Sequence, residues 1–87
     1  MNESKAQLLY NYFCKELANI RKNKNISQEE VSFELNISAS YLSRIENAKL
    51  KNFPFTVCIM LCDYYGVHLD DVYKIANNKL EIDQQFL

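Results

Sequence analysis

The chain of 87 residues contains one glycine, one proline and no tryptophan. Because sheet proteins need many turns, and turns are built largely from glycine and proline, this scarcity argues against an all-β fold. No apolar stretch approaches the roughly 20 residues that span a bilayer, and no signal-peptide pattern opens the chain. These features predict one cytoplasmic domain, residues 1–87, with no membrane segment.

Side chains that carry catalytic or metal chemistry are also scarce. The three cysteines do not have the spacing of a disulfide framework, and His68 is the only histidine. Cys58 and Cys62 lie four residues apart, but a metal site there would need further ligands. With one glycine no phosphate-binding glycine loop can form, and no Ser/His/Asp or Cys/His set is present. We therefore expect no cofactor, no metal and no enzymatic activity, and interpret the cysteines as small buried residues.

The net charge of −1 hides an uneven distribution. Between Arg21 and Lys51, six basic residues accompany four acids, whereas from Asn52 to the end two lysines accompany five acids. Such a polarised domain can present a basic face to phosphates. A chance imbalance of the surface explains the same numbers, so charge alone does not decide the partner.

Hydrophobic periodicity predicts helices throughout, and hence an all-α fold. Residues 4–22 carry one apolar stripe at three- and four-residue steps, formed by Ala6, Leu9, Phe13, Leu17 and Ile20. After residues 28–35 and 39–47, the segment 54–65 is apolar nearly all round, which predicts a central buried helix. A short fifth helix is expected at 69–76. Residues 77–87 then form an apolar tail, suited to dimerisation.

The two short helices in the middle of the chain lie unusually close together. Ser27 begins an S-x-x-E capping box with Glu30, and Ser38 is the next N-cap candidate. Val31 is expected to face inward, with Phe33 packing nearby. Two short helices joined by three residues cross steeply, which is the helix-turn-helix arrangement. Because the second helix then protrudes, its small and polar outer side chains can enter a DNA major groove.

The order and spacing of five segments, about residues 17–73, resemble the phage-repressor-like (Cro/C1, XRE) family. The matching segments are Ile20-Arg21, Ile26-Ser27-Gln28-Glu29-Glu30-Val31, Tyr41-Leu42-Ser43-Arg44-Ile45-Glu46-Asn47, Leu61-Cys62-Asp63-Tyr64-Tyr65-Gly66-Val67 and Leu69-Asp70-Asp71-Val72. The resemblance implies a five-helix repressor-like domain, here with an extended first helix, that binds double-stranded DNA.

The resemblance also implies roles by position. Arg21 and Glu46 would form a structural salt bridge, and Arg44 would bind guanine through its two-pronged guanidinium. Gln28 would bind a phosphate and brace the recognition helix. The full set of implied DNA contacts is Gln28, Ser38, Ala39, Ser40, Tyr41, Ser43, Arg44, Asn47, Lys49, Lys51 and Asn52. Four of these contacts have simpler alternatives: Lys49 and Lys51 as solvated lysines, Gln28 as an early-helix residue, and Arg44 as the partner of a nearby acid.

Two positions depart from the family pattern. Asn36 and Ala48 stand where the family usually has glycine. A positive φ at Ala48 would cost on the order of 1 kcal/mol, which predicts that the loop carrying Lys49 and Lys51 takes a different shape.

These observations predict a homodimeric transcriptional repressor of a palindromic operator. A dimer doubles the few contacts that one copy makes and reads two half-sites about 34 Å apart. The alternative is an antitoxin or partner-sequestered regulator, in which the fifth helix and tail bind a protein partner.

Overall fold

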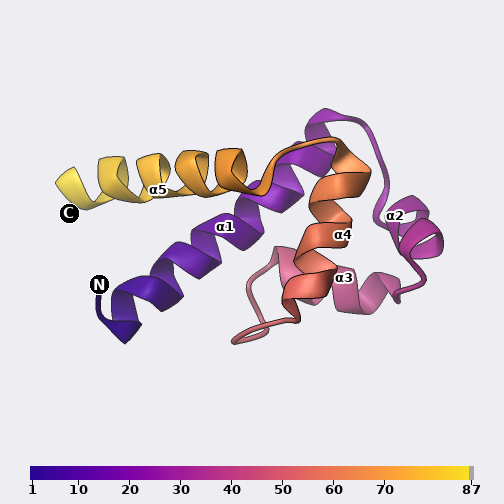
Figure 1. Cartoon of the computed structure of the whole chain (residues 1–87), viewed down its shortest axis with the longest axis horizontal. Coiled ribbons are helices and arrows are strands. Elements are labelled where there is room, and N and C mark those ends of the chain that lie inside the picture. The colour runs from indigo at the N-terminus through magenta and orange to yellow at the C-terminus, as the bar shows by residue number, and fades with distance from the viewer. Residues whose placement is uncertain (87) are drawn as a thin grey trace.

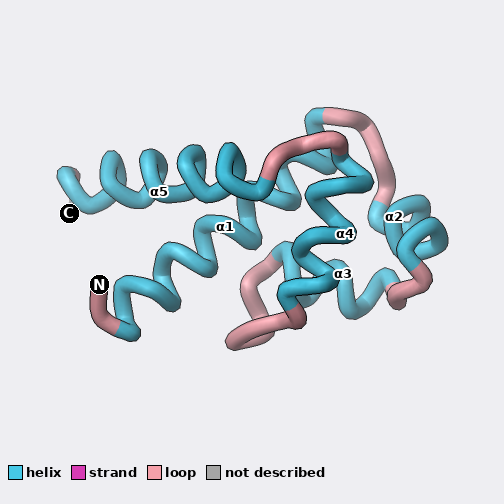
Figure 2. The backbone as a smooth tube through the Cα atoms, viewed as in Figure 1, coloured by secondary structure: helices cyan, strands magenta, loops and turns pink. Residues whose placement is uncertain are grey.

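The computed structural model describes residues 1–86, which form five helices and no strand (Figures 1 and 2). The helices are α1 (Glu3–Asn23), α2 (Gln28–Leu35), α3 (Ala39–Glu46), α4 (Phe55–Tyr65) and α5 (Leu69–Gln85). The all-α, five-helix expectation is therefore confirmed. Leu87, the last residue of the predicted tail, lies outside the described residues.

Three helices begin with a side-chain cap. The side-chain oxygens of Asn2, Ser27 and Ser38 each accept a hydrogen bond from the backbone N–H three residues later, at 2.8, 3.0 and 3.0 Å. Each bond satisfies one of the donors that a helix start leaves free. The return bond of the predicted capping box is absent among residues 1–86, where the Glu30 carboxylate accepts from the Tyr64 hydroxyl at 3.3 Å.

Four helix ends close in the same way. Asn25, Asn36, Ala48 and Gly66 have φ angles of 58°, 55°, 54° and 68°. After each, the next N–H reaches the carbonyl five residues earlier, as in Lys49 N–H to Arg44 O at 2.9 Å. This Schellman closure normally uses glycine. The expectation that Ala48 avoids positive φ was wrong. Two backbone hydrogen bonds, from Ala48 N–H to Ile45 O and from Lys49 N–H to Arg44 O, hold it in the left-handed region.

The main core gathers one face of each helix. Its fully buried side chains include Leu17 of α1, Val31 of α2, Leu42 of α3 and Leu61 of α4. The buried face of α1 differs slightly from the predicted apolar stripe. Ala6 is exposed, whereas Cys14 and Ala18, which were not in the stripe, are buried. The helix pattern was right, but the neighbouring helices decide which edge of the stripe they cover.

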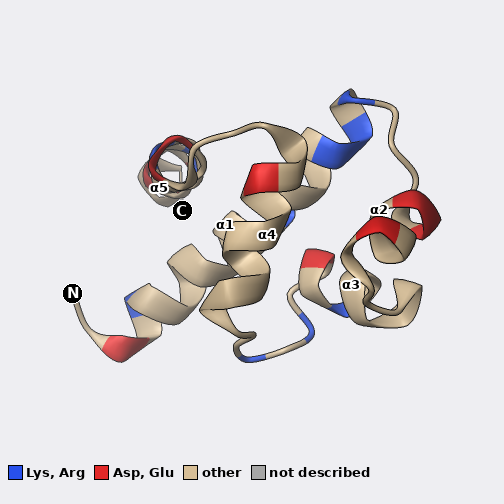
Figure 3. Cartoon of the chain, turned by 45° about the vertical axis from the view of Figure 1, so that its right-hand side comes forward, with Lys and Arg blue, Asp and Glu red and all other residues tan. Residues whose placement is uncertain are grey.

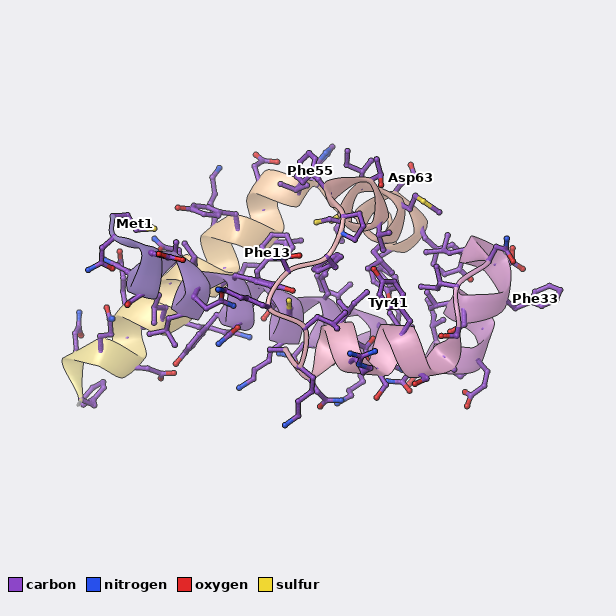
Figure 4. The ribbon with its side chains drawn as sticks, turned by 90° about the horizontal axis from the view of Figure 1, so that it is seen from below. Met1, Phe13, Phe33, Tyr41, Phe55 and Asp63 are labelled. Carbon is purple, nitrogen blue, oxygen red and sulfur yellow. The ribbon has the colours of Figure 1, made fainter. Side chains whose placement is uncertain are left out.

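The prediction that α4 is a central buried helix is confirmed for one of its faces and wrong for the other. Cys58, Leu61, Cys62 and Tyr65 are buried, but Phe55 is 64% exposed and Ile59 49%. So small a domain has no second layer to cover the outer face of this helix. Phe33, expected to pack near the core, is 84% exposed and points away from the body of the molecule (Figure 4).

The predicted short fifth helix and tail are one long helix. α5 runs to Gln85, and its second half lies beside the first half of α1 (Figure 1). Leu9, Ala76 and Leu80 form a second small core there. The Lys79 Nζ lies 2.6 Å from Glu16 Oε1. We call this pair of half-helices, residues 3–16 and 73–85, the arm.

Candidate nucleic-acid interface

α3 is anchored on one side and open on the other. Leu42 and Ile45 are fully buried. Ser40, Arg44 and Asn47 are exposed, and their spacing of four and three residues places them on one stripe. The helix therefore presents a guanidinium between two short polar side chains, with its apolar face fixed in the core.

A buried ion pair fixes α3 against α1. Arg21 Nε and Nη2 donate to the two carboxylate oxygens of Glu46 at 2.7 and 3.0 Å. Arg21 Nη1 donates to Ile26 O at 2.7 Å, and Gln28 Nε2 donates to Glu46 Oε1 at 2.9 Å. The hydrogen bonds to Glu46 raise the pKa of the Arg21 guanidinium. One carboxylate thus joins α1, the start of α2 and the end of α3, which sets the angle at which α3 protrudes.

Positive charge on this side of the molecule is not neutralised within the chain. Among residues 1–86 the ion pairs are Arg21–Glu46, Lys74–Asp70 and Lys79–Glu16. Arg44, Lys49 and Lys51 are exposed and take part in none of them. Figure 3 shows basic residues at the end of α1, on α3 and along the loop that follows it, whereas α2 carries acids. The exposed stripe of α3 is therefore flanked by free cations.

A family model described as helix-turn-helix matches residues 17–72. The chain belongs to the Cro/C1-type (XRE) helix-turn-helix family. This is a family of DNA-binding transcriptional regulators and is generally non-enzymatic. A comparison with curated proteins found no match.

In this XRE-type domain the other side chains that were predicted to contact DNA differ in their exposure to solvent. Ser38, Lys49, Lys51 and Asn52 are exposed. Ala39 and Ser43 are half-buried at the edges of α3, and so is Tyr41, which lies between α3 and α4 in Figure 4. The Asn47 amide nitrogen donates to Ser43 O at 2.9 Å, so this amide must turn outward to contact DNA.

Sequence reasoning missed three residues of α1. Lys15, Asn19 and Lys22 line one polar surface depression together with Gln28 and Asn47. Their spacing of four and three residues marks the polar face of α1, which was visible in the sequence. What the sequence did not reveal is that this face lies beside the start of α2. It brings two more lysines to the side of the domain that carries Gln28 and Asn47.

The buried cysteines are present as unreactive thiols. Burial raises the pKa of the Cys14 thiol to about 11 and that of Cys58 to about 12, so both stay protonated near neutral pH. Within residues 1–86 no three His, Cys, Asp or Glu side chains gather in a way that suits a metal ion. No helix in that range combines the length and apolar character needed to cross a bilayer.

Proposed function

We propose that this chain is a homodimeric transcriptional repressor that binds a palindromic operator in double-stranded DNA. The observation that carries the proposal is the exposed Ser40–Arg44–Asn47 stripe, bordered by cations that have no partner among residues 1–86. A protruding helix with free positive charge at its edge matches the needs of the major groove.

Within this proposal the side chains divide into two groups. Arg44 reads guanine O6 and N7, while Ser40, Tyr41 and Ser43 contact neighbouring base edges and Ala39 offers a methyl contact. The second group binds phosphates and fixes register without reading sequence. It consists of Gln28, Ser38, Asn47, Lys49, Lys51 and Asn52. The proximity of Lys15 and Lys22 adds both lysines to this second group.

The second copy of the chain is proposed to dock on α5. Ile75, Ile82 and Phe86 are exposed apolar residues at spacings of seven and four, so they form one stripe along α5 and its C-cap. Ile82 is 54% exposed and Phe86 83%. A dimer would cover this stripe and present two α3 helices to half-sites about 34 Å apart. Repression follows most simply, because occupying a promoter needs no further surface.

The same stripe supports one alternative, a partner-sequestered regulator or antitoxin that uses it to bind a different protein. Selection of bound sites from a random duplex pool, at two salt concentrations, separates the two. Recovery of a palindromic motif with half-sites one helical turn apart, retained at the higher salt, is the expected result. A pool that stays random, or binding that disappears with modest salt, would leave only phosphate attraction and favour the partner protein.

A further inference from the structure

The loop between α3 and α4 lacks support of its own. We call residues 48–53 the basic loop, since they include Lys49 and Lys51. After the closure at Lys49, no backbone–backbone hydrogen bond within residues 1–86 involves residues 50–53. The conformation of this stretch is therefore not fixed by backbone hydrogen bonds of its own.

Two side chains of α1 supply that support. The Tyr10 hydroxyl donates to Leu50 O at 3.0 Å, and Gln7 Nε2 donates to Lys51 O at 3.2 Å. The Tyr10 ring also packs against Phe53, with centroids 5.9 Å apart and planes tilted by 35°. Burial raises the pKa of the Tyr10 hydroxyl, which keeps it a hydrogen-bond donor across the physiological range. The carbonyls held in this way belong to Leu50 and to Lys51 itself.

Both side chains come from outside the helix-turn-helix match, which begins at residue 17. The extended first half of α1 thus has a second use besides packing against α5. It reaches back, over about 40 residues of sequence, to the segment that carries two free cations. Lys51 also shares a surface depression with Glu3, Ser4 and Gln7, so the first turns of α1 lie directly beside it.

We propose that Tyr10 and Gln7 are positioning residues for DNA binding. They hold the basic loop in its bound shape, so Lys49 and Lys51 can meet the phosphate backbone without the loop having to become ordered on association. This inference rests on the proposed DNA binding. Lysine side chains are flexible point charges, so the accuracy with which they meet phosphates depends on the backbone that carries them. A loop already held in its bound shape avoids the entropy loss of ordering on association.

The test compares two tyrosines of the same helix. Tyr10→Phe removes the hydroxyl that holds Leu50 O and keeps the ring against Phe53. Tyr12→Phe is the matched control, because the Tyr12 hydroxyl bonds to the Asp83 carboxylate inside the arm and not to the loop. Affinity for the selected operator is measured for both at several salt concentrations. Backbone order parameters of residues 49–53 are measured without DNA.

For Tyr10→Phe we expect lower order parameters in the loop and an affinity loss of roughly 5- to 20-fold, as for a loop that loses preorganisation. The slope of log K against log salt should fall by about 0.9 for each phosphate that the lysines no longer neutralise. Tyr12→Phe should change none of these three quantities. In a Lys49→Ala/Lys51→Ala background, Tyr10→Phe should have no further effect, because the charges that it positions are gone.

An affinity and salt slope equal to wild type in Tyr10→Phe would overturn the inference, whatever happens to the order parameters. An equal loss in both phenylalanine variants would also overturn it, since that result indicates general destabilisation of the arm. Failure of the proposed function looks different: wild type itself would select no sequence, and all variants would bind duplex DNA with the same weak, salt-sensitive affinity.

Discussion

Replacing Ala48 by glycine should stabilise the protein, although it removes a methyl group. Ala48 has a φ of +54°, a region that costs an L-residue with a Cβ about 1–2 kcal/mol. Glycine removes this strain but gives the unfolded chain more conformational freedom, which offsets about 0.4–1 kcal/mol. Taking the middle of each range, the net gain in the free energy of unfolding should be about 0.8 kcal/mol. For a domain of this size that corresponds to a melting temperature higher by roughly 2–8 °C.

Thermal and urea unfolding followed by circular dichroism would measure this change, and two other helix ends supply controls. Gly66 has the same closure at φ +68°, and a Cβ added there meets no atom within 4 Å. Gly66→Ala should therefore lose about what Ala48→Gly gains, about 0.8 kcal/mol. Asn36→Gly should change stability by a few tenths of a kcal/mol, because asparagine tolerates this region. An Ala48→Gly variant that is no more stable than wild type would refute the strain argument.

Three further predictions concern DNA binding, assembly and pH. Arg44→Ala should weaken operator binding by about 1–3 kcal/mol and relax preference at one position per half-site; an unchanged base preference in a repeated site selection would exclude this role. Ile82→Asn should lower the sedimentation mass from dimer towards monomer without loss of helicity, and a mass equal to wild type would place the interface elsewhere. This variant is cleaner than truncation before Asn77, which would also remove Leu80 from the arm core. The free energy of unfolding should fall as pH rises from 9 to about 11, because unfolded cysteines ionise near 9.0 while native Cys14 keeps its proton. In Cys14→Ala the free energy of unfolding, measured by urea titration at each pH, should fall less steeply over this range. A pH dependence equal to that of wild type would contradict the role of Cys14.

Local sequence was sufficient for the helix-turn-helix unit. Ser27 and Ser38 mark the starts of α2 and α3, and each caps its helix as expected. The anchoring of α3 by Leu42 and Ile45 also follows from spacing alone. The caps depend on bonds between residues three apart, and the buried side of α3 repeats at helical spacing, so a sequence pattern is enough to reveal both.

What the sequence could not reveal depends on packing between distant segments. α5 was expected to stop at Ala76, because its second half gains stability only from α1, as at Leu9 and Leu80. The bond from Tyr10 to Leu50 O spans 40 positions and leaves no periodic pattern in the sequence. Phe33 fits a helix pattern equally well inside or outside, and only the absence of a covering neighbour among residues 1–86 decides that it is exposed.

The continuity of α1 has a consequence for how the molecule comes apart. Leu9 belongs to the small core of the arm and Leu17 to the main core, while Phe13 packs against both. One uninterrupted helix of 21 residues, about 30 Å long, carries all three. Fraying of the arm therefore loosens Phe13 and exposes the main core. For this reason the arm cannot unfold separately from the rest of the domain. The chain should unfold as a single cooperative unit, in which the segment outside the helix-turn-helix match and the segment inside it share one transition.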